Sequence, residues 1–438
     1  MSGSDAWRQV SARLDAEQDW LVELVQSLVR IPTVNPKFQA DPEINREAEH
    51  QAHLEGVLKE LDFATEQSLP LPDRPNLTGR WDGSAERSLI LCGHVDVVPV
   101  GETALWSADP FGAEIRGDRL YGRGALDMKG GLAACIAAAR AIRAEGIRLD
   151  GRLDVHAVVD EEAGGFGAMD LVKKGVLSRA ALIAEPTWGV INPSEGGLEW
   201  VRVTIRGKNA HAGWRYNSIY PQVPSNKRPE PGINAIELGA RFIEAVRELE
   251  REWGMRKYHP QLPPGITTIN PGVMLGGAGL GPDGRPLVTT NPAIIPDVCV
   301  MEFDLKFLPD EKAEVVRAEF EGFVHHWAQT NAWLRDNPPK VEWEVGGLHF
   351  PPVDTPTDHP LIGSLIAHRT ELGRTTDIEG FVAVSDAAHY AGAGTTCVIY
   401  GPGGDGFHGI DEYIELPSLQ ESAKVIAGAI LDWCGTVE

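Results

Sequence analysis

The chain has 438 residues, more than one domain usually holds, so we expect two or three domains. Its hydrophobic fraction of 42% is high enough for packed cores and excludes a wholly disordered protein. With 40 basic and 63 acidic residues the net charge is −23, and such a surface repels phosphate backbones. We therefore expect no nucleic-acid partner.

The sequence also bears on the cellular compartment. No apolar run is long enough to span a membrane, and the polar N-terminal segment lacks the apolar region of a secretion signal. The five cysteines are widely spaced and form no CxxC pair, which is typical of reduced core residues. We predict a cytoplasmic protein without membrane contact.

The first part of the chain alternates between helical and strand patterns. Residues 20–30 carry apolar side chains at helical spacing, and the Ala-rich residues 130–145 predict a second helix. Short apolar runs at 88–92, 153–159 and 181–184 predict buried strands. This alternation is typical of a sheet with helices packed on both faces.

The middle of the chain predicts a β-α-β-β-α-β order, which is a ferredoxin-like sandwich with both helices on one face of its sheet. Its predicted elements, in chain order, are residues 198–207, 234–250, 267–275, 298–307, 311–327 and 340–345. On the helix 234–250 the apolar stripe is expected to include Ile236, Ala240 and Ile243. The Gly- and Pro-rich residues 220–232 and 276–296 predict loops.

The last part of the chain returns to the first pattern. It predicts a helix over 361–372, a strand over 395–400 and a C-terminal helix, with Ser418 and Glu421 at capping-box spacing. We therefore predict one α/β domain built from residues 1–196 and 349–438. An α+β domain, residues 197–348, is inserted into it.

Histidines and carboxylates follow the predicted strands of the α/β domain. His94, the run Asp160–Glu162, Glu185 and His408 come after strands, and Asp127 lies just before the Ala-rich helix. Because open α/β sheets bind ligands at the carboxyl ends of their strands, these side chains are expected to share one crevice. Two histidines and three carboxylates suit a pair of divalent ions, with Asp127 as the bridging ligand.

Asp96 lies two residues past His94 and is expected to accept the ring N–H that His94 does not use on the metal. Each of these features is weak when taken alone. A single His-x-Asp seldom binds metal, the acidic run is commonly a solvated loop, and Glu185-Pro186 is commonly a turn after a strand. Their joint occurrence at strand ends favours the metal site.

Six segments match a known family in order along nearly the whole chain. They are GHVDVVPVG, DPFGAEIRGDRLYGRGALDMKGG, VVDEEAGGFGA, AEPT, GKNAHAG and GPGGDGFHGIDEY. The sequence thus resembles the acetylornithine deacetylase/succinyl-diaminopimelate desuccinylase family of co-catalytic zinc hydrolases. The resemblance implies a three-layer α/β/α zinc-exopeptidase-like catalytic domain, an inserted lid domain, and a homodimer formed through that lid.

The resemblance also implies roles for individual residues. By this resemblance His94 and Glu185 bind one ion, and Glu162 and His408 bind the other. Asp127 binds both ions and is followed by a cis peptide bond. Glu161 matches the general base, and His211 matches a lid histidine that reaches the partner subunit's active site. The ions are expected to be zinc, although cobalt and manganese accept the same ligands.

The activity expected from this site is hydrolysis of an amide C–N bond in a small N-acylated amine or amino acid. Water would be activated by the metal ions, with Glu161 as base and Asp96 and His211 assisting. A metallo-dipeptidase or carboxypeptidase of the same family is the nearest alternative. An inactive metal-binding protein is a more remote one.

Two segments depart from the family pattern. Many members hold a substrate carboxylate with arginines at positions where this chain has Lys306, in Asp304-Leu305-Lys306, and Ala388, in Ser385-Asp386-Ala387-Ala388. Lysine lacks the bidentate fork of arginine. Arg215, Asn270 and Lys306 therefore remain only candidates for substrate binding.

The stretch EGGLEWVRVTIRGKNAHAGWRY is closer to the subgroup that contains formylaminopyrimidine deformylase. That subgroup hydrolyses N-acyl amines without an α-carboxylate. Trp188, Trp214 and Tyr216 are candidates for an apolar wall around an aromatic group, although tryptophans at such positions are as often structural.

Overall fold

The computed structural model describes residues 3–216 and 231–437, so most of the loop expected at 220–232 lies outside the described residues. The chain forms two compact units. The first combines Met1–Glu195 with Val353–Glu438, and the second is Gly196–Pro352. The sequence placed the joints after residues 196 and 348. Each unit is described by itself below.

A nine-stranded mixed sheet forms the centre of the first unit. Its middle consists of four parallel strands, in the order β6 (Gly151–Val158), β3 (Ser84–His94), β7 (Ala180–Ile183) and β19 (Thr396–Ile399). Further strands complete both sides: β1 (Ala64–Leu71) and β2 (Arg74–Trp81) beyond β6, and β8 (Ile191–Glu195), β17 (Val353–Asp354) and β18 (Ile378–Phe381) beyond β19. The parallel strands therefore end together at one edge.

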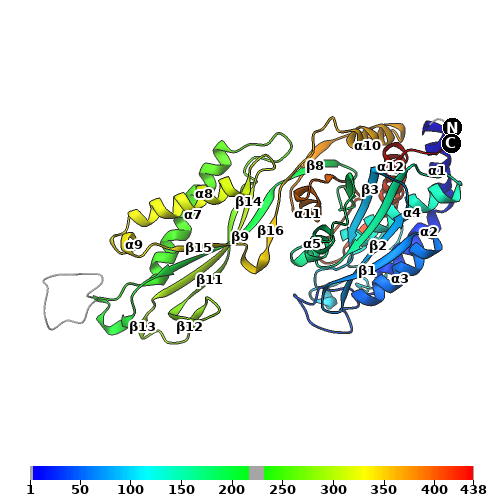
Figure 1. Ribbon diagram of the computed structural model, residues 1–438. Helices are drawn as coiled ribbons and strands as arrows, with labels where there is room; N and C mark the ends of the chain where they lie inside the picture. The colour runs from blue at the N-terminus through cyan, green and yellow to red at the C-terminus, as the bar shows by residue number, and fades with distance from the viewer. Residues whose placement is uncertain (1–2, 217–230, 438) are drawn as a thin grey trace. The chain divides into compact units, whose positions relative to one another are not determined.

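Helices cover both faces of this sheet (Figure 1). One face carries α2 (Gln18–Val29), α3 (Glu47–Glu60), α4 (Gly131–Ala144), α10 (Pro360–Glu371) and α12 (Leu416–Cys434), with α1 (Gly3–Ala16) packed outside them. The other face carries α5 (Phe166–Lys173) and α11 (Ala387–Gly392). An Arg13–Glu145 ion pair of 2.7 Å fastens α1 to the end of α4. The predicted α/β/α sandwich is confirmed.

Close packing explains why small residues line this sheet. A Cβ on Gly93 would lie 3.0 Å from the Leu132 side chain, so α4 sits directly against the end of β3. On the opposite face Tyr390 of α11 shares a 2.8 Å hydrogen bond with His156 of β6. The end of β3, where His94 lies, is thus held between two helical layers.

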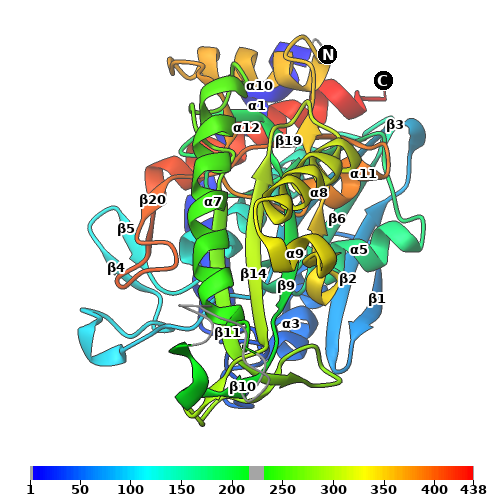
Figure 2. The same ribbon diagram turned by 90° about the vertical axis from the view of Figure 1, so that its left-hand side faces the viewer.

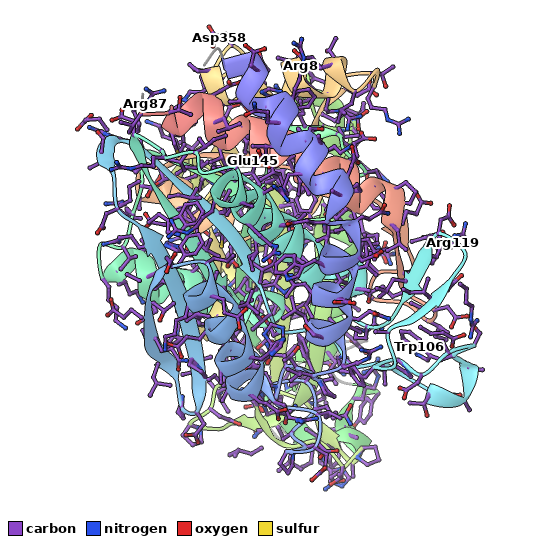
Figure 3. All side chains as sticks on the ribbon, turned by 90° about the vertical axis from the view of Figure 1, so that its right-hand side faces the viewer. Arg8, Arg87, Trp106, Arg119, Glu145 and Asp358 are labelled. Atoms are coloured by element: carbon purple, nitrogen blue, oxygen red, sulfur yellow. The ribbon has the colours of Figure 1, made fainter. Side chains whose placement is uncertain are left out.

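A small four-stranded sheet joins distant parts of the first unit. Its strands are β20 (Gly404–Asp405), β21 (Tyr413–Glu415), β5 (Arg119–Tyr121) and β4 (Glu114–Arg116). Arg119 and Trp106, labelled in Figure 3, lie on this projecting part of the unit. Because β21 pairs with β5, the segment after His408 runs beside the segment that leads to Asp127.

The second unit is an antiparallel sheet with two long helices, α7 (Ala235–Arg256) and α8 (Ala313–Gln329), lying across it (Figure 2). The strand order is β12 (Pro286–Val288), β11 (Ile269–Leu280), β14 (Val298–Phe307), β9 (Gly197–Arg206) and β15 (Lys340–Trp343). Phe242, Phe303 and Phe320 meet edge to face in the core between helices and sheet. The ferredoxin-like prediction is confirmed.

Shorter elements complete the two units. They are η1 (Thr103–Leu105), η2 (Ala125–Gly130), η3 (Glu161–Ala163), β10 (Ala210–His211), η4 (Ala212–Trp214), β13 (Ile294–Ile295), α9 (Ala332–Asp336), η5 (Val345–Gly347) and β16 (His349–Phe350). In the residues described, we find no helix long and apolar enough to cross a bilayer. All five cysteines are buried and unpaired.

Three local predictions were wrong. Residues 276–296 are not one loop, because β11 continues to Leu280 and pairs with β12 through main-chain bonds that glycines also make. On α7, Ile236 and Ala240 are exposed, and the buried stripe runs through Leu238 and Phe242 instead.

The third error concerns the start of α12. The helix already begins at Leu416, so Ser418 lies within its first turn instead of capping it. The Ser418 hydroxyl accepts a 2.8 Å hydrogen bond from the Gly403 N–H, and Glu421 pairs with Arg369 and Arg374. The side chains expected to cap the helix are used for tertiary contacts.

Candidate metal centre

Asp127 lies between two histidines. His94 is the last residue of β3, and its Nε2 is 3.1 Å from Oδ1 of Asp127. His408 follows β19 and β20 along the chain, and its Nε2 is 3.2 Å from Oδ2 of Asp127. Each carboxylate oxygen of Asp127 thus faces a different imidazole, which is the arrangement that a carboxylate shared by two cations requires. The peptide bond between Asp127 and Met128 is cis, as the family resemblance implied.

Three glutamates surround this pair. Glu162 Oε2 is 3.0 Å from Nε2 of His408, whereas Glu161 Oε2 and Glu185 Oε1 are each 3.9 Å from Nε2 of His94. Ligand atoms of His94, Asp127 and Glu162 all lie within 4.8 Å of one another. The structure therefore brings together all five residues predicted as ligands and the predicted base, and the donor set fits two divalent cations.

The electrostatics of the cluster also favour bound cations. Burial, and then the charges of neighbouring acids, raise the pKa of Glu161 and of Glu185 well above the usual carboxyl value. The hydrogen bonds that Asp127 and Glu162 accept from His408 raise the pKa of His408 to about 10. Carboxylates this crowded are costly to ionise together, and divalent cations among them would offset that cost.

Asp96 acts differently from the prediction. The Nδ1–H of His94 donates to the main-chain carbonyl of Asp96 over 2.8 Å, while the Asp96 carboxylate lies 3.8 Å from that nitrogen. The carbonyl still fixes the tautomer that leaves Nε2 of His94 free for a metal. The Asp96 carboxylate instead accepts from the main-chain N–H of Glu161 (3.1 Å) and from Asn35 (2.8 Å). Asp96 thus positions the predicted base.

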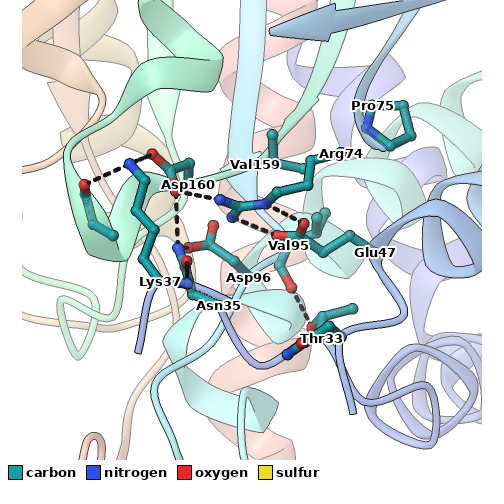
Figure 4. Close-up of polar contacts among 12 residues, drawn as sticks. Thr33, Asn35, Lys37, Glu47, Arg74, Pro75, Val95, Asp96, Val159 and Asp160 are labelled. Carbon is teal, nitrogen blue, oxygen red and sulfur yellow. Dashed lines mark hydrogen bonds and ion pairs between the residues drawn. The ribbon is translucent and has the colours of Figure 1, made fainter. Parts of the chain in front are cut away.

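A largely buried ionic network, which we call the floor, adjoins the candidate ligands through Asp96 and the main-chain N–H of Glu161. It comprises Asn35, Lys37, Glu47, Arg74, Asp96 and Asp160 (Figure 4). Arg74 donates to both oxygens of Glu47 (2.5 and 2.8 Å) and to Asp160 (2.5 Å). Lys37 donates to the second oxygen of Asp160 over 2.6 Å. Asp160 has φ 72°, a strained value for this residue, and it directly precedes Glu161.

A second buried anchor holds Asp127. Glu412 accepts hydrogen bonds from the main-chain N–H groups of Gly124 (3.1 Å), Leu126 (2.9 Å) and Asp127 (3.0 Å), and it pairs with Arg123 (2.6 Å). Its carboxylate is completely buried. Glu412 lies shortly after His408 in the sequence. Its side chain therefore joins the segment that carries His408 to the segment that carries Asp127.

Sequence reasoning missed most of these supports. Glu412 lies in the matched GFHGIDEY segment, but nothing in that motif states its role. Arg74, Glu47 and Asn35 belong to no motif, and Arg74 reaches Asp160 across 86 residues. The strained backbone at Asp160 leaves no recognisable local pattern.

The remaining candidates lie in the second unit. His211 is exposed at the end of β10 and accepts from the Gly213 N–H. Arg215 pairs with Glu237, Asn270 is exposed on β11, and Lys306 is half-buried on β14. Of the proposed aromatic wall, Trp214 contacts Tyr216 in this unit, whereas Trp188 belongs to the first unit. Their assignment to the active site stays a prediction.

Two bacterial proteins resemble this chain over nearly its whole length. An N-formyl-4-amino-5-aminomethyl-2-methylpyrimidine deformylase from Bacillus subtilis (strain 168) is 32% identical over 435 residues, which is 96% of each chain. A protein of the same name from Halalkalibacterium halodurans is 31% identical and covers 97% of each chain. Both matches span the two units.

Solved structures share the fold. The aminopeptidase PepT from Bacillus cereus ATCC 10987 matches with a TM-score of 0.70 at 20% identity, covering 95% of this chain and 98% of that one. The model of peptidase family M20/M25/M40 matches residues 90–432, which contain every candidate ligand. The family resemblance is thereby confirmed, and the chain belongs to peptidase family M20/M25/M40.

Proposed function

We propose that this protein is a binuclear metal-dependent amide hydrolase that removes a formyl or other short acyl group from an amine. The observation that carries the proposal is the position of Asp127, whose two oxygens face His94 and His408 while Glu161 lies beside them. The deformylases that resemble this chain along nearly its whole length support the same chemistry.

His94 and Glu185 would hold one ion, Glu162 and His408 the other, and Asp127 both. Zinc suits this mixture of imidazole and carboxylate ligands, and cobalt and manganese are alternatives. The cations supply Lewis acidity, which lowers the pKa of water and polarises an amide carbonyl. Elemental analysis of the purified active enzyme tests both the number and the identity of the ions.

Glu161 then transfers the proton. Glu161 accepts a proton from the attacking water and delivers it to the amide nitrogen as the C–N bond breaks and the new C–O bond forms. Asp96 accepts from the Glu161 N–H and Arg74 holds the preceding Asp160, so the backbone that carries this carboxylate is kept in position. The products are a carboxylate, formate for a formyl substrate, and the amine, which takes up the second proton of the water and leaves as an ammonium ion.

The missing arginines indicate what the substrate lacks. Ala388 is fully buried on α11 and carries no charge, and the neighbouring Asp386 is itself a buried carboxyl group. This segment offers no cation that could pair with a substrate carboxylate. We therefore propose a substrate without an α-carboxylate, which argues against a dipeptidase or carboxypeptidase.

The second unit is proposed to act as a lid and dimerisation unit, with His211 donating to the developing oxyanion of the partner's active site. Loss of one such donor typically lowers turnover about 10²–10³-fold. His211→Ala should therefore keep its metal and lose that much in kcat. A monomer by light scattering, or a fully active variant, would contradict this role. The buried unpaired cysteines favour a reducing compartment, and we propose the cytoplasm.

The decisive experiment is a substrate panel with metal-reconstituted enzyme. It compares N-formyl, N-acetyl and N-succinyl amines, including the formylated pyrimidine named for the relatives, with dipeptides. We expect the N-formyl amine lacking a carboxylate to give the highest kcat/KM, and the Glu161→Gln variant serves as a control for contaminating hydrolases. Faster turnover of dipeptides would replace this proposal with the dipeptidase alternative.

A further inference from the structure

Two large aromatic side chains lie exposed beside the metal centre. Phe407 directly precedes His408, and Trp188 lies on the loop that follows Glu185. Phe407 is 45% exposed and Trp188 is 50% exposed. We call this pair the aromatic shelf.

The shelf is continuous with a candidate metal ligand. The ring centroids of Phe407 and His408 are 5.9 Å apart, and those of Trp188 and Phe407 are also 5.9 Å apart with their planes at 62°. His408 Nε2 in turn faces Asp127 and Glu162. A row of rings therefore leads outward from the ligand cluster within one unit.

The fold holds the Trp188 ring in place. Its indole N–H donates to the Gly404 carbonyl over 2.7 Å. A Cβ on Gly403 would lie 2.7 Å from Cδ1 of Trp188, so only glycine leaves room for the ring. The loop after β7 and the loop after β19 are also joined by a 3.0 Å bond from Gly189 N–H to the Gly401 carbonyl. The ring is thus fixed before any ligand arrives.

Stability alone does not explain this arrangement. Trp188 has φ 54°, a left-handed value that is costly for a bulky residue. Half of its surface remains in water, so the strain is not offset by full burial of the ring. Strained backbone that displays a fixed, exposed aromatic beside a catalytic cluster is typical of a ligand-binding position.

We propose that the aromatic shelf binds a flat ring in the amine part of the substrate. This rests on the proposed function and names the substrate class: N-acyl amines that carry an aromatic or heteroaromatic ring. Trp188 and Phe407 form an angled corner in which a planar ring can stack on one face and contact the other by its edge. The small acyl group then lies toward the buried ligands, and the larger amine part lies on the exposed side beside His408.

The test compares an aromatic substrate, N-formylbenzylamine, with an aliphatic one, N-formylpropylamine. For Trp188→Ala and for Phe407→Ala we expect kcat/KM on the aromatic substrate to fall about 3- to 10-fold through KM, because one aromatic pair contributes that much. Turnover of the aliphatic substrate should stay the same. Gly403→Ala, which displaces the indole without removing it, should act like Trp188→Ala, and Trp188→Phe should be close to wild type.

Tyr258→Ala is the matched control, since Tyr258 is an exposed aromatic of the second unit. Metal content and melting temperature are measured for every variant, so that loss of folding is recognised. Equal losses on both substrates, or no loss in either shelf variant, would overturn the proposal.

A binding measurement separates this proposal from the proposed function. Calorimetry on the metal-loaded protein compares benzylamine with propylamine, and it needs no turnover. We expect tighter binding of benzylamine to the wild type and loss of that preference in both shelf variants. If the protein hydrolyses no amide but still binds benzylamine more tightly than propylamine, the proposed reaction is wrong and the proposed role of the aromatic shelf is supported. If the wild type binds both amines equally, the shelf fails.

Discussion

The two sides of the metal centre are built in opposite ways. On the floor, the carboxylates are buried and each accepts a hydrogen bond: the Arg74 side chain is 8% exposed and contacts both Glu47 and Asp160, and Asn35 donates to Asp96. The opposite side, formed by His408 and the aromatic shelf, is here called the mouth. There the His408 side chain is 51% exposed, and its ring contacts Phe407 of the shelf. One side surrounds the acids with fixed charges, and the other presents apolar rings to solvent.

This contrast separates two tasks. Buried ion pairs add little net stability, but they hold their partners in one geometry. The floor is therefore suited to positioning Glu161 and Glu162, whatever the substrate is. The exposed rings of the shelf lie beside the candidate ligand His408 and face solvent, so they are suited to choosing the substrate. Changes to the floor should alter kcat and stability, and changes at the mouth should alter KM.

Removal of the metal should have the largest effect. A chelator is expected to abolish activity, and at free zinc about 1,000 times Kd the lost binding corresponds to about 4 kcal/mol of stability. Restoration of zinc should recover both, as followed by assay and thermal melting. Activity that survives complete chelation would remove the basis for the whole comparison.

The metal-free protein should also show a distinct pH dependence. Glu161 and Glu185 have pKa values raised by burial, so their ionisation destabilises the fold as pH rises above the ordinary value of 4.5. His408, raised to about 10 by Asp127 and Glu162, contributes stability that is lost as pH rises toward that value. Both act in the same direction, so the melting temperature of the metal-free protein should fall with rising pH over this range, more than that of the metal-bound protein.

Glu161→Gln should have the next largest effect. Removal of a general base typically costs about 10²–10⁴-fold in kcat, and the neutral amide keeps the size of the side chain. Metal content should remain unchanged, whereas Glu162→Gln should lose metal because Glu162 faces His408. Elemental analysis beside the assay distinguishes the two variants, and loss of metal in Glu161→Gln would exchange their roles.

Arg74→Met tests how much the floor depends on its buried cation. It leaves Glu47 and one oxygen of Asp160 buried without their cation, which typically costs about 3–5 kcal/mol. Urea unfolding measures this loss, and kcat should fall as well, since Asp160 no longer holds the backbone at Glu161. Unchanged KM values for the two formyl substrates described above would confirm that the floor does not select between them.

Lys37→Met is the matched control and should have the smallest effect. Lys37 pairs with the same carboxylate as Arg74, but its side chain is 39% exposed. Pairs this open to solvent typically contribute about 0–1 kcal/mol. A loss as large as that of Arg74→Met would show that the burial of the cation is not what distinguishes the two.

The gathering of the candidate ligands was predictable because these residues follow strand ends. Buried apolar runs precede His94, Glu185 and the acidic run after β6. Because these runs form parallel strands, their carboxyl ends meet at one edge of the sheet, whatever path the chain takes between them. The ferredoxin-like order was predictable for a similar reason, since alternating and helical patterns are local. What can be predicted is what short stretches of chain encode by themselves.

The floor and the details of packing were not predictable in this way. Arg74 contacts Asp160 only because β2 joins the sheet beside β6, and no spacing within either segment encodes that contact. The capping-box spacing at Ser418 was misleading because the helix begins earlier, at Leu416, and the Ser418 hydroxyl accepts from the Gly403 N–H. The hairpin within 276–296 was missed because main-chain pairing needs no side-chain pattern.

The Glu412 anchor has a consequence for biosynthesis. Its hydrogen bonds to Gly124, Leu126 and Asp127 join the two segments of the first unit across 285 or more residues, with the whole second unit translated in between. During translation the early ligands emerge from the ribosome long before Glu412 and His408 do. A nascent or truncated chain thus lacks a complete dinuclear site, and metal loading becomes one of the last events in maturation of the enzyme.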